Sequence, residues 1–539
     1  MDDLRVSRWS LLLAIHLVTV GCADDAAGVD GGDAGRRLDA SGDVGLSGTD
    51  SGSDAGTAVE DARTPDRDAA EWSAEVVLDE NLAFPTVMGF GRGATGGEGG
   101  RIIRVTNLDD SGEGSFRAAV EASGARVVHF DVAGNIVLRS RIFVTNGDLT
   151  IAGETAPGDG VALVSSGDES SFNGSLMTLV GDNIVVRFIR LRRLGEELGS
   201  NTGGGGILGR ADGTAHDYVY DHVTWSWMSD DLTGAAFRGA TGITYQNCMF
   251  YESLRKTGQE WHGGKGSLFY GNLGDISLIQ NLWANLPQRN PSVSTYTRDA
   301  RLEHVNNLVY NRAFQGLTLA VREGGETTGR PATGTLQANV LGNHYIPGAD
   351  TFVSSERYSM FASTARVLVY VDDNLTQQRT EHSQPQWDCM GSGPNGDDPA
   401  PTSLQNVTPF EMTIDPGDVL PVDEVEAHVL ANAGANISRD AADARIVREI
   451  SDRTARIIRE AYPIDREYPI LEGDPWTYAP GTHIPVDFAT AHGVVSDDEV
   501  RDEWVLGGVR VVNTVGATAY QIWRWHRAGD FAARARVAR

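Results

Sequence analysis

The chain of 539 residues has little cysteine, which excludes two common ways of stabilising a protein. Three cysteines are present, and the two beyond Cys22 cannot form a disulfide framework for a body of this size. No spacing of cysteine and histidine resembles a zinc site. Cys248 lies in an apolar run and is expected in the core.

Positive charge is also scarce. Lys and Arg number 45 against 74 Asp and Glu, a formal net charge of −29. Proteins that bind nucleic acid need a basic face, so this balance argues against such a partner. An anionic ligand would have to be met locally by Arg, Lys or a bound cation.

The apolar run near the N-terminus, residues 11–20, is too short to cross a bilayer. With Arg5 and Arg8 before it, the run predicts an export signal over residues 1–22. The sequence Thr19-Val20-Gly21-Cys22 resembles a bacterial lipobox, although Thr19 stands where leucine is usual. We expect an outer-membrane or cell-surface lipoprotein anchored through a lipid on Cys22; the alternative is an ordinary cleaved signal and a secreted protein.

Residues 23–75 contain scarcely any large apolar side chain and consist mainly of Asp, Gly, Ala and Ser. Such a segment cannot bury enough apolar surface to offset its ordering entropy, and we expect a disordered acidic linker. The remaining chain is predicted to form a β-helix domain over residues 76–425 and a C-terminal extension with an amphipathic helix over residues 426–539.

An internal repeat indicates the fold. A polar pair followed by a residue that is usually asparagine and then an apolar residue recurs with steps of 25, 34, 26, 32 and 35 residues. These irregular steps disagree with helical solenoids and propellers but suit an all-β, right-handed parallel β-helix, whose loops vary in length. Asparagines could stack in a ladder or accept the left-handed backbone of a coil corner. The repeat places these residues in third position: His222, Asn247, Asn281, Asn307, Asn339 and Asn374.

Two helices are expected beside the coils. Residues 115–122 carry helix formers between glycines and should cap the N-terminal end of the solenoid. Residues 441–461 place apolar side chains on one stripe, which predicts a helix packed on the solenoid. The polar segment 377–421 is expected to be a long loop.

An ordered series of motifs is similar to the bacterial pectate lyases of the parallel β-helix class, over most of residues 84–460. The fold that this resemblance implies agrees with the repeat. The motifs are Gly89-Phe90-Gly91-Arg92, Val105-Thr106-Asn107-Leu108-Asp109-Asp110-Ser111-Gly112, Phe130-Asp131-Val132-Ala133-Gly134, Thr155-Ala156-Pro157-Gly158-Asp159-Gly160, Val219-Tyr220-Asp221-His222, Glu252-Ser253-Leu254, Arg289-Asn290-Pro291 and Arg439-Asp440-Ala441-Ala442-Asp443-Ala444-Arg445.

The resemblance implies cleavage of polygalacturonate or pectin by β-elimination. Arg289 would be the base that removes the proton on carbon 5, and Lys265 would bind the substrate. Asp230 and Asp231 would help to hold calcium, a cation that stabilises the developing negative charge. A guanidinium normally stays protonated, so a basic Arg needs a depressed pKa or a concerted transfer. We expect the enzyme to be a monomer.

Two departures from the family pattern leave the activity open. Residues 203–206 are four glycines where a first calcium-binding Asp cluster is expected, and Ser294 replaces a second Arg. The alternatives are a calcium-independent enzyme like the pectin lyases and an inactive surface protein that binds carbohydrate. Trp225, Trp227, Trp261 and Trp283 could stack on sugars, although strand alternation puts at least half of them in packing positions. Asp221-His222 is interpreted as structural.

Overall fold

The computed structural model describes residues 73–537 except for gaps at 166–174, 194–202, 211–212, 229, 236–237, 255–263, 323–331, 353–356, 364, 394, 459–475 and 479–480. The predicted export signal, almost all of the predicted linker, and Trp261 lie outside these residues. In the described part of the chain, no helix combines the length and the apolar character needed to cross a membrane.

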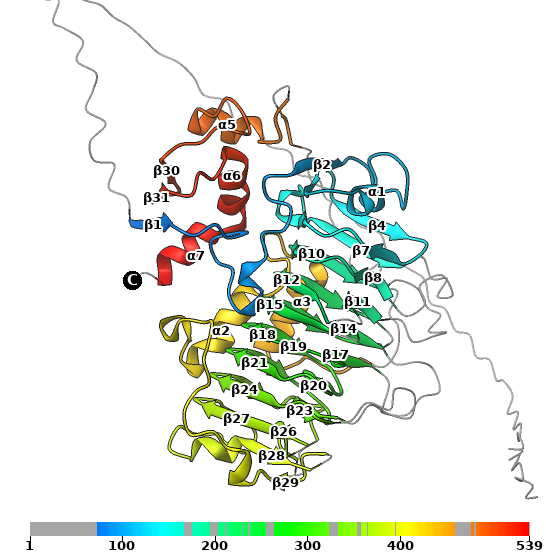
Figure 1. The fold of residues 1–539 in the computed structure, drawn as a ribbon, viewed down its shortest axis with the longest axis vertical. Coiled ribbons are helices and arrows are strands. Elements are labelled where there is room, and N and C mark those ends of the chain that lie inside the picture. The colour runs from blue at the N-terminus through cyan, green and yellow to red at the C-terminus, as the bar shows by residue number, and fades with distance from the viewer. Residues whose placement is uncertain are drawn as a thin grey trace, which may run out of the picture. The chain divides into compact units, whose positions relative to one another are not determined.

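Three stacked sheets confirm the parallel β-helix (Figure 1). Sheet 1 contains, in spatial order, β2 (Arg101–Val105), β3 (Arg126–Phe130), β6 (Leu149–Ala152), β9 (Ile184–Arg187), β12 (Ala215–Asp221), β15 (Ala240–Gln246), β18 (Ile276–Ile279), β21 (Ala300–Val305), β24 (Leu336–Leu341) and β27 (Val367–Asp372). Sheet 2 contains β4 (Gly134–Leu138), β7 (Val161–Ser165), β10 (Ile189–Arg192), β13 (Thr224–Ser226), β16 (Met249–Tyr251), β19 (Leu282–Ala284), β22 (Leu308–Tyr310) and β25 (His344–Ile346).

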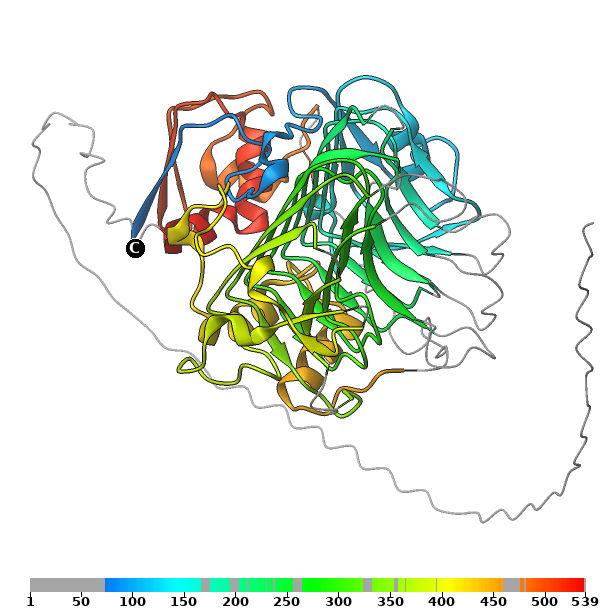
Figure 2. The ribbon, with the colours of Figure 1, turned by 60° about the horizontal axis from the view of Figure 1, so that its bottom comes forward.

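Sheet 3 carries the site described below. Its strands are β5 (Ile142–Val144), β8 (Ser175–Leu179), β11 (Gly203–Ile207), β14 (Asp231–Ala235), β17 (Lys265–Phe269), β20 (Ser292–Thr295), β23 (Leu317–Val321), β26 (Met360–Ala362), β28 (Met390–Ser392) and β29 (Asp398–Pro399). Neighbouring strands are parallel except for the last pair, β28 and β29, which is antiparallel. Figure 2 shows the coils stacked on one another.

Apolar side chains from all three sheets fill the interior of the coils. The strands are short and rich in Val, Ile and Leu, as expected where parallel strands are buried on both faces. Trp225 and Trp283 stack on either side of Phe250 within this core, with ring centroids 5.0 and 4.9 Å away. Trp227 is buried as well, under the C-terminal helices. These three tryptophans are therefore packing residues.

At the corner that follows sheet 1, the residues of successive coils stack in two adjacent columns. Each column takes one of the two roles predicted for asparagine. The first column has a left-handed backbone, with φ between 48° and 60°. The next column forms the ladder, in which the amide of each asparagine donates to Oδ1 of the next over 3.1, 2.9 and 2.8 Å. The left-handed column is His222, Asn247, Gln280, Asn306, Gly342 and Asp373, and the ladder is Asn281, Asn307, Asn343 and Asn374.

Two asparagines of the predicted repeat therefore do not belong to the ladder. Asn247 lies in the left-handed column, and Cys248 takes the ladder position beside it, its N–H donating to Asn281. Asn339 lies inside β24 and donates to the carbonyl of Phe410 at 3.1 Å. Because β24 continues to Leu341, its corner falls later and Asn343 occupies the ladder.

Helix α1 (Phe116–Glu121) confirms the N-terminal cap, since Phe116, Ala119 and Val120 are buried in the solenoid core. The short 3-10 helix η1 (Phe90–Gly93) packs on β12 and β15 in the middle of sheet 1, and η2 (Gly153–Thr155) directly follows β6. At the other end, segment 377–421 contains η4 (Gln386–Cys389), η5 (Thr402–Leu404) and η6 (Pro416–Asp418) and adds β28 and β29 to sheet 3. It is thus less irregular than predicted.

Helix α2 (Val422–Asn432), not predicted, and α3 (Ala441–Ser451) cover sheet 2. The predicted helix over 441–461 was too long, because the chain turns at Arg453, which has φ 58°. Arg192 of β10 holds α3 through ion pairs to Asp440 and, at 2.8 Å, Asp443. This packing confirms the predicted helical segment on the solenoid.

The last residues form a module that was not predicted. Strands β30 (Glu503–Leu506) and β31 (Val509–Asn513) join β1 (Ala74–Leu78) in a small sheet beside α5 (Val486–His492), α6 (Ala519–Ala528) and α7 (Asp530–Val537). Its apolar side chains pack on the outer face of sheet 1. Arg187 of β9 binds Asp530 of α7 at 3.0 Å and Asp221 at 2.8 Å, all three side chains being buried.

Candidate active site

The four predicted site residues lie together along one edge of sheet 3, the edge formed by the N-terminal ends of its strands. Asp231 begins β14 and Lys265 begins β17, and the two are paired in register. Arg289 lies three residues before β20 and reaches Asp231 with its Nη1 atom, at 2.6 and 2.7 Å from the two carboxylate oxygens. Lys265 Nζ donates to Asp230 Oδ1 at 2.6 Å. The site therefore contains two adjacent ion pairs.

The backbone around Arg289 is held by neighbouring coils. Arg289 has φ 60°, a left-handed conformation that costs about 1–3 kcal/mol for a residue with a side chain. Its carbonyl accepts the N–H of Ser267 at 2.7 Å. A Cβ on Gly266 would lie 2.2 Å from that carbonyl oxygen, so only glycine permits this close approach. The strained backbone is thus fixed by its contact with β17.

The four side chains are partly open to solvent, between 17% and 28% exposed. Burial raises the pKa of Asp231 to about 6, although the charge of Arg289 acts to lower it. The neighbouring carboxylate of Asp230 raises it further. Asp231 is therefore a carboxylate that can take up a proton near neutral pH, in direct contact with Arg289.

The carboxylates near Arg289 are too few for a calcium site. Calcium takes six to eight oxygen ligands, whereas Asp230 and Asp231 are two residues already paired with cations. The pairing of β11 with β14 places the predicted glycine run beside Asp231, since Gly206 pairs with Gly234. Within the described ranges, no three acidic, His or Cys residues are grouped so that they could hold a metal. These residues do not by themselves fit a resident calcium ion.

The sequence did not predict three further residues at this site. Arg322 follows β23, and both burial and the charge of Arg289 lower its pKa. Tyr270 and Tyr296 meet edge to face, 6.4 Å between centroids. Burial raises the pKa of Tyr270. The charge of Asp231 acts to raise this pKa further, and the charge of Arg289 acts to lower it.

Ser294, which stands in place of the expected second Arg, is only 1% exposed. It pairs in register with Ala320 of β23, two residues before Arg322. Arg322 follows the C-terminal end of β23 and Arg289 precedes β20, so the two arginines start from opposite ends of neighbouring strands, and the charge of one still acts on the other. A search for basic residues directly after predicted sheet 3 strands could have found Arg322.

The Asp221-His222 pair lies away from this site. Asp221 is buried and accepts from Arg187 at 2.8 Å and from His222 Nδ1 at 2.8 Å. Burial acts to raise the pKa of Asp221, but the charges of His222 and Arg187 outweigh it and lower the pKa. The pair joins sheet 1 to the C-terminal module, in agreement with a structural role.

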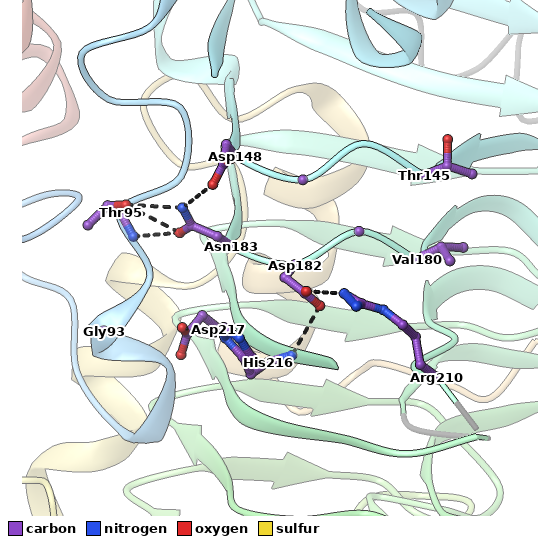
Figure 3. Close-up of a pocket in the computed structure, with 12 residues that line it drawn as sticks. Gly93, Thr95, Thr145, Asp148, Val180, Asp182, Asn183, Arg210, His216 and Asp217 are labelled. Atoms are coloured by element: carbon purple, nitrogen blue, oxygen red, sulfur yellow. Dashed lines mark hydrogen bonds and ion pairs between the residues drawn. The ribbon is translucent and has the colours of Figure 1, made fainter. Parts of the chain in front are cut away.

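A separate polar pocket of about 620 Å³ lies at the opposite ends of the sheet 3 strands, where β5 and β8 lead into sheet 1 (Figure 3). Asp182 pairs there with Arg210, and Asn183 donates to Asp148 at 2.8 Å. His216 contacts Asp217 at 2.7 Å. With three carboxylates and one Arg, this pocket is less suited to an acidic ligand than the edge that carries Arg289.

Comparisons with known proteins place the chain in a family. No protein-family model matches the chain. Among curated proteins, the chain is 30% identical to "Probable pectate lyase C" of Aspergillus flavus over 82% of its own length and 93% of the relative. It is 32% identical to the protein of that name from Aspergillus fumigatus over 68% and 77% of the two chains.

Solved structures of lower similarity include the major allergen of cedar pollen, 17% identical, with a TM-score of 0.41 over 65% of this chain and 92% of the allergen. A pectate lyase variant from Xanthomonas campestris is 16% identical, with a TM-score of 0.40 over 65% and 98%. On the extent and identity of its match to the Aspergillus relatives, the chain belongs to the pectate lyase family and is a polysaccharide lyase.

Proposed function

We propose that this protein is an exported polysaccharide lyase that cleaves pectate or pectin by β-elimination, with Arg289 receiving the proton. The observation that carries the proposal is the contact of Arg289 with Asp231, beside the Lys265 and Asp230 pair, on a partly exposed edge. The relatives are named pectate lyases, and the substrate class follows from them.

The reaction removes the proton on carbon 5 of a galacturonate unit. The electron pair of that C–H bond forms the double bond between carbons 4 and 5, and the oxygen on carbon 4 leaves with the electrons of its bond and takes a proton from solvent water. Negative charge develops next to the carboxylate, so cations held close to it lower the barrier. Lys265 and Arg289 are the basic side chains proposed to do this, and the charge of Arg322 on the next coil adds to theirs.

A protonated Arg289 cannot accept a proton unless it gives one away. We infer a relay in which an Nη1 proton of Arg289 passes to Asp231 as the guanidinium takes the proton from carbon 5. One N–H bond forms as another breaks, and Asp231 ends as a carboxylic acid. The distances of 2.6 and 2.7 Å and the raised pKa of Asp231 favour this transfer.

A calcium-independent enzyme like the pectin lyases is the second candidate. Two observations favour it: both carboxylates are already neutralised by cations, and glycine lies beside Asp231 on β11. Calcium dependence would require further ligands from the substrate or from residues outside the described part of the chain.

The test is the absorbance of the unsaturated product from polygalacturonate and from highly methylated pectin, each with calcium and with a chelator. We expect product from the wild type and a loss of about 10²–10⁴-fold in Arg289→Ala. Arg301→Ala is the matched control, because Arg301 also pairs with an aspartate at 2.7 Å but lies on sheet 1. Binding without product under any condition would favour the inactive carbohydrate-binding protein instead.

Export and anchoring also remain proposals. Residues 1–22 would direct export, Cys22 would carry the lipid, and residues 23–75 would tether the monomeric enzyme to the membrane. Cys22→Ser should move the protein from the membrane fraction to the medium. An unchanged distribution would rule out the lipid anchor.

A further inference from the structure

The edge of sheet 3 that carries Arg289 continues toward a second group of side chains. In order along the sheet, β14, β17, β20, β23, β26 and β28 follow one another (Figure 1). Their pairings join Leu268 to Ser292, Ser292 to Thr318, Leu317 to Met360, and Met360 to Met390. Extending these pairings toward the strand starts gives one row: Asp231, Lys265, Arg289, Gln315, Tyr358 and Asp388.

The far end of this row opens into a cavity of about 580 Å³. Tyr358 and Trp387 contribute two half-buried aromatic rings to it, and Gln377 and Gln378 contribute amides. The indole N–H of Trp387 donates to Ala400 at 2.9 Å, which fixes its ring. The cavity therefore combines flat apolar surfaces with oriented hydrogen-bonding groups, the usual composition of a small-ligand site.

The buried side chain of Arg312 connects the cavity to the coil of β23. It donates to Ser359 at 2.6 Å, to the carbonyl of Phe314 at 3.1 Å and to Gln377 at 3.3 Å. Phe314 stacks on Phe352 with 4.8 Å between ring centroids, directly before Gln315 of the row. An apolar surface thus lies between Arg289 and the cavity.

Among its described lining residues the cavity has no cation, unlike the Arg289 site, where Lys265 and Arg289 pair with two aspartates. Asp388 is the one charged residue among those that line it, and it is exposed. Burial and this carboxylate raise the pKa of Tyr358, which agrees with their closeness. A galacturonate carboxylate would be repelled here, whereas an uncharged sugar ring could stack on the aromatic rings and bind the amides.

The spacing suits one polysaccharide chain. Adjacent strands lie about 4.8 Å apart, so β26 and β28 are roughly 10–15 Å from β20 along the sheet. That is the length of a few sugar units. A chain held at Arg289 and running along the edge would reach the cavity.

We propose that the cavity at Tyr358 and Trp387 is a distal subsite for an uncharged sugar residue of the chain that is cleaved at Arg289. The residue would be a methyl-esterified galacturonate or a neutral side-chain sugar. This inference rests on the proposed function and deepens it, because it makes the enzyme selective for long chains that are partly uncharged.

The test compares kcat/KM for long, partly esterified pectin with kcat/KM for trigalacturonate, which has no uncharged unit to place in the cavity. We expect Tyr358→Ala to lower this ratio about tenfold. Asp388→Lys, at an exposed position, should lower the same ratio. It should also raise kcat/KM on long polygalacturonate above that of the wild type. Tyr370→Ala is the control, an aromatic residue of the last coils that lies on β27 in sheet 1. Unchanged ratios in both cavity variants would overturn the subsite.

Direct binding measurements distinguish a methyl-esterified galacturonate from a neutral side-chain sugar as the ligand of the cavity. They also test the subsite separately from the lyase activity. Calorimetry would use a fully methyl-esterified oligogalacturonate and a neutral galacto-oligosaccharide as probes, with wild type and Tyr358→Ala. Weaker binding of either probe to the variant supports the subsite and identifies its ligand, and equal binding of both overturns it. A wild-type protein that yields no unsaturated product would refute the lyase proposal alone, because the binding measurement does not depend on turnover.

Discussion

In the proposed mechanism, Asp231 is the residue that allows Arg289 to act as a base. Two of its properties come from the same position at the start of β14: burial raises its pKa to about 6, and Arg289 Nη1 lies 2.6 and 2.7 Å from its oxygens. In the relay, only the ionised carboxylate can accept the proton. The active fraction should therefore shrink as the pH falls through 6.

We expect kcat/KM on polygalacturonate to fall about tenfold for each pH unit below 6. Asp231→Asn should lose most activity, about 10²–10⁴-fold, and its remaining rate should lack this acid limb. The measurement is a pH–rate profile of both proteins, and far-UV circular dichroism controls for folding. A fully active variant with the same acid limb would refute the relay.

The four predicted site residues could be named from the sequence because the family resemblance marks their positions, and the structure places them side by side. Arg322 was not named, because its relation to Arg289 arises from the stacking of coils and not from the family pattern. The ion pairs themselves were also beyond prediction. Lys265 pairs with Asp230 and Arg289 pairs with the adjacent aspartate. Which aspartate each cation contacts depends on the register of the sheet 3 strands.

At the scale of elements, the asparagine ladder holds the corners of the later coils together. Asn307 Oδ1 accepts the backbone N–H of Asn281 at 2.9 Å, and its own amide donates to Leu278 at 2.8 Å and Asn343 at 2.9 Å. All of these atoms are buried. Their hydrogen bonds cannot be replaced by water if the side chain is removed.

We expect Asn307→Ala to lower the free energy of unfolding by about 3 kcal/mol, because it leaves buried donors and acceptors unpaired. Gln337→Ala on β24, a half-buried polar residue outside the ladder, should change it by less than about 0.5 kcal/mol. Urea denaturation followed by tryptophan fluorescence measures both. Equal effects of the two substitutions would mean that the ladder adds no particular stability.

The strands of the middle coils could be predicted because asparagine and apolar residues recur there. The assignment of asparagines to the two columns could not, since strands such as β24 differ in length from their neighbours. Strands β30 and β31 have no repeat to reveal them. They pair with each other as a hairpin around Gly507 and Gly508, and the third strand of their sheet, β1, comes from more than 400 residues away in sequence.

At the scale of the whole described body, Arg187 joins the solenoid to the C-terminal module. Its guanidinium contacts Asp221 of β12 and Asp530 of α7, and Glu154 lies 4.0 Å away. Arg524 of α6 reaches the same Glu154 at 2.9 Å and Glu98 at 2.7 Å. Arg187 and Asp530, and Arg524 and Glu154, form these buried ion pairs only while the module is docked.

Arg187→Met should destabilise the protein by about 3–5 kcal/mol, because it leaves buried carboxylates without their cation. We expect one calorimetric transition for the wild type and an earlier, separate loss of the module in the variant. Limited proteolysis should then cut the module first. A variant that melts in one transition at the wild-type temperature would show that the pair does not couple the two parts.

The reversed direction of β29 has a consequence for the protein at high concentration. A stack of parallel strands that ended openly could add a second molecule, coil upon coil, and grow into a filament. Here the last strand of sheet 3 is antiparallel and ends at Pro399, which has no N–H to offer an incoming strand. The chain thus blocks its own end-to-end assembly at this end of sheet 3, the sheet that carries the candidate active site.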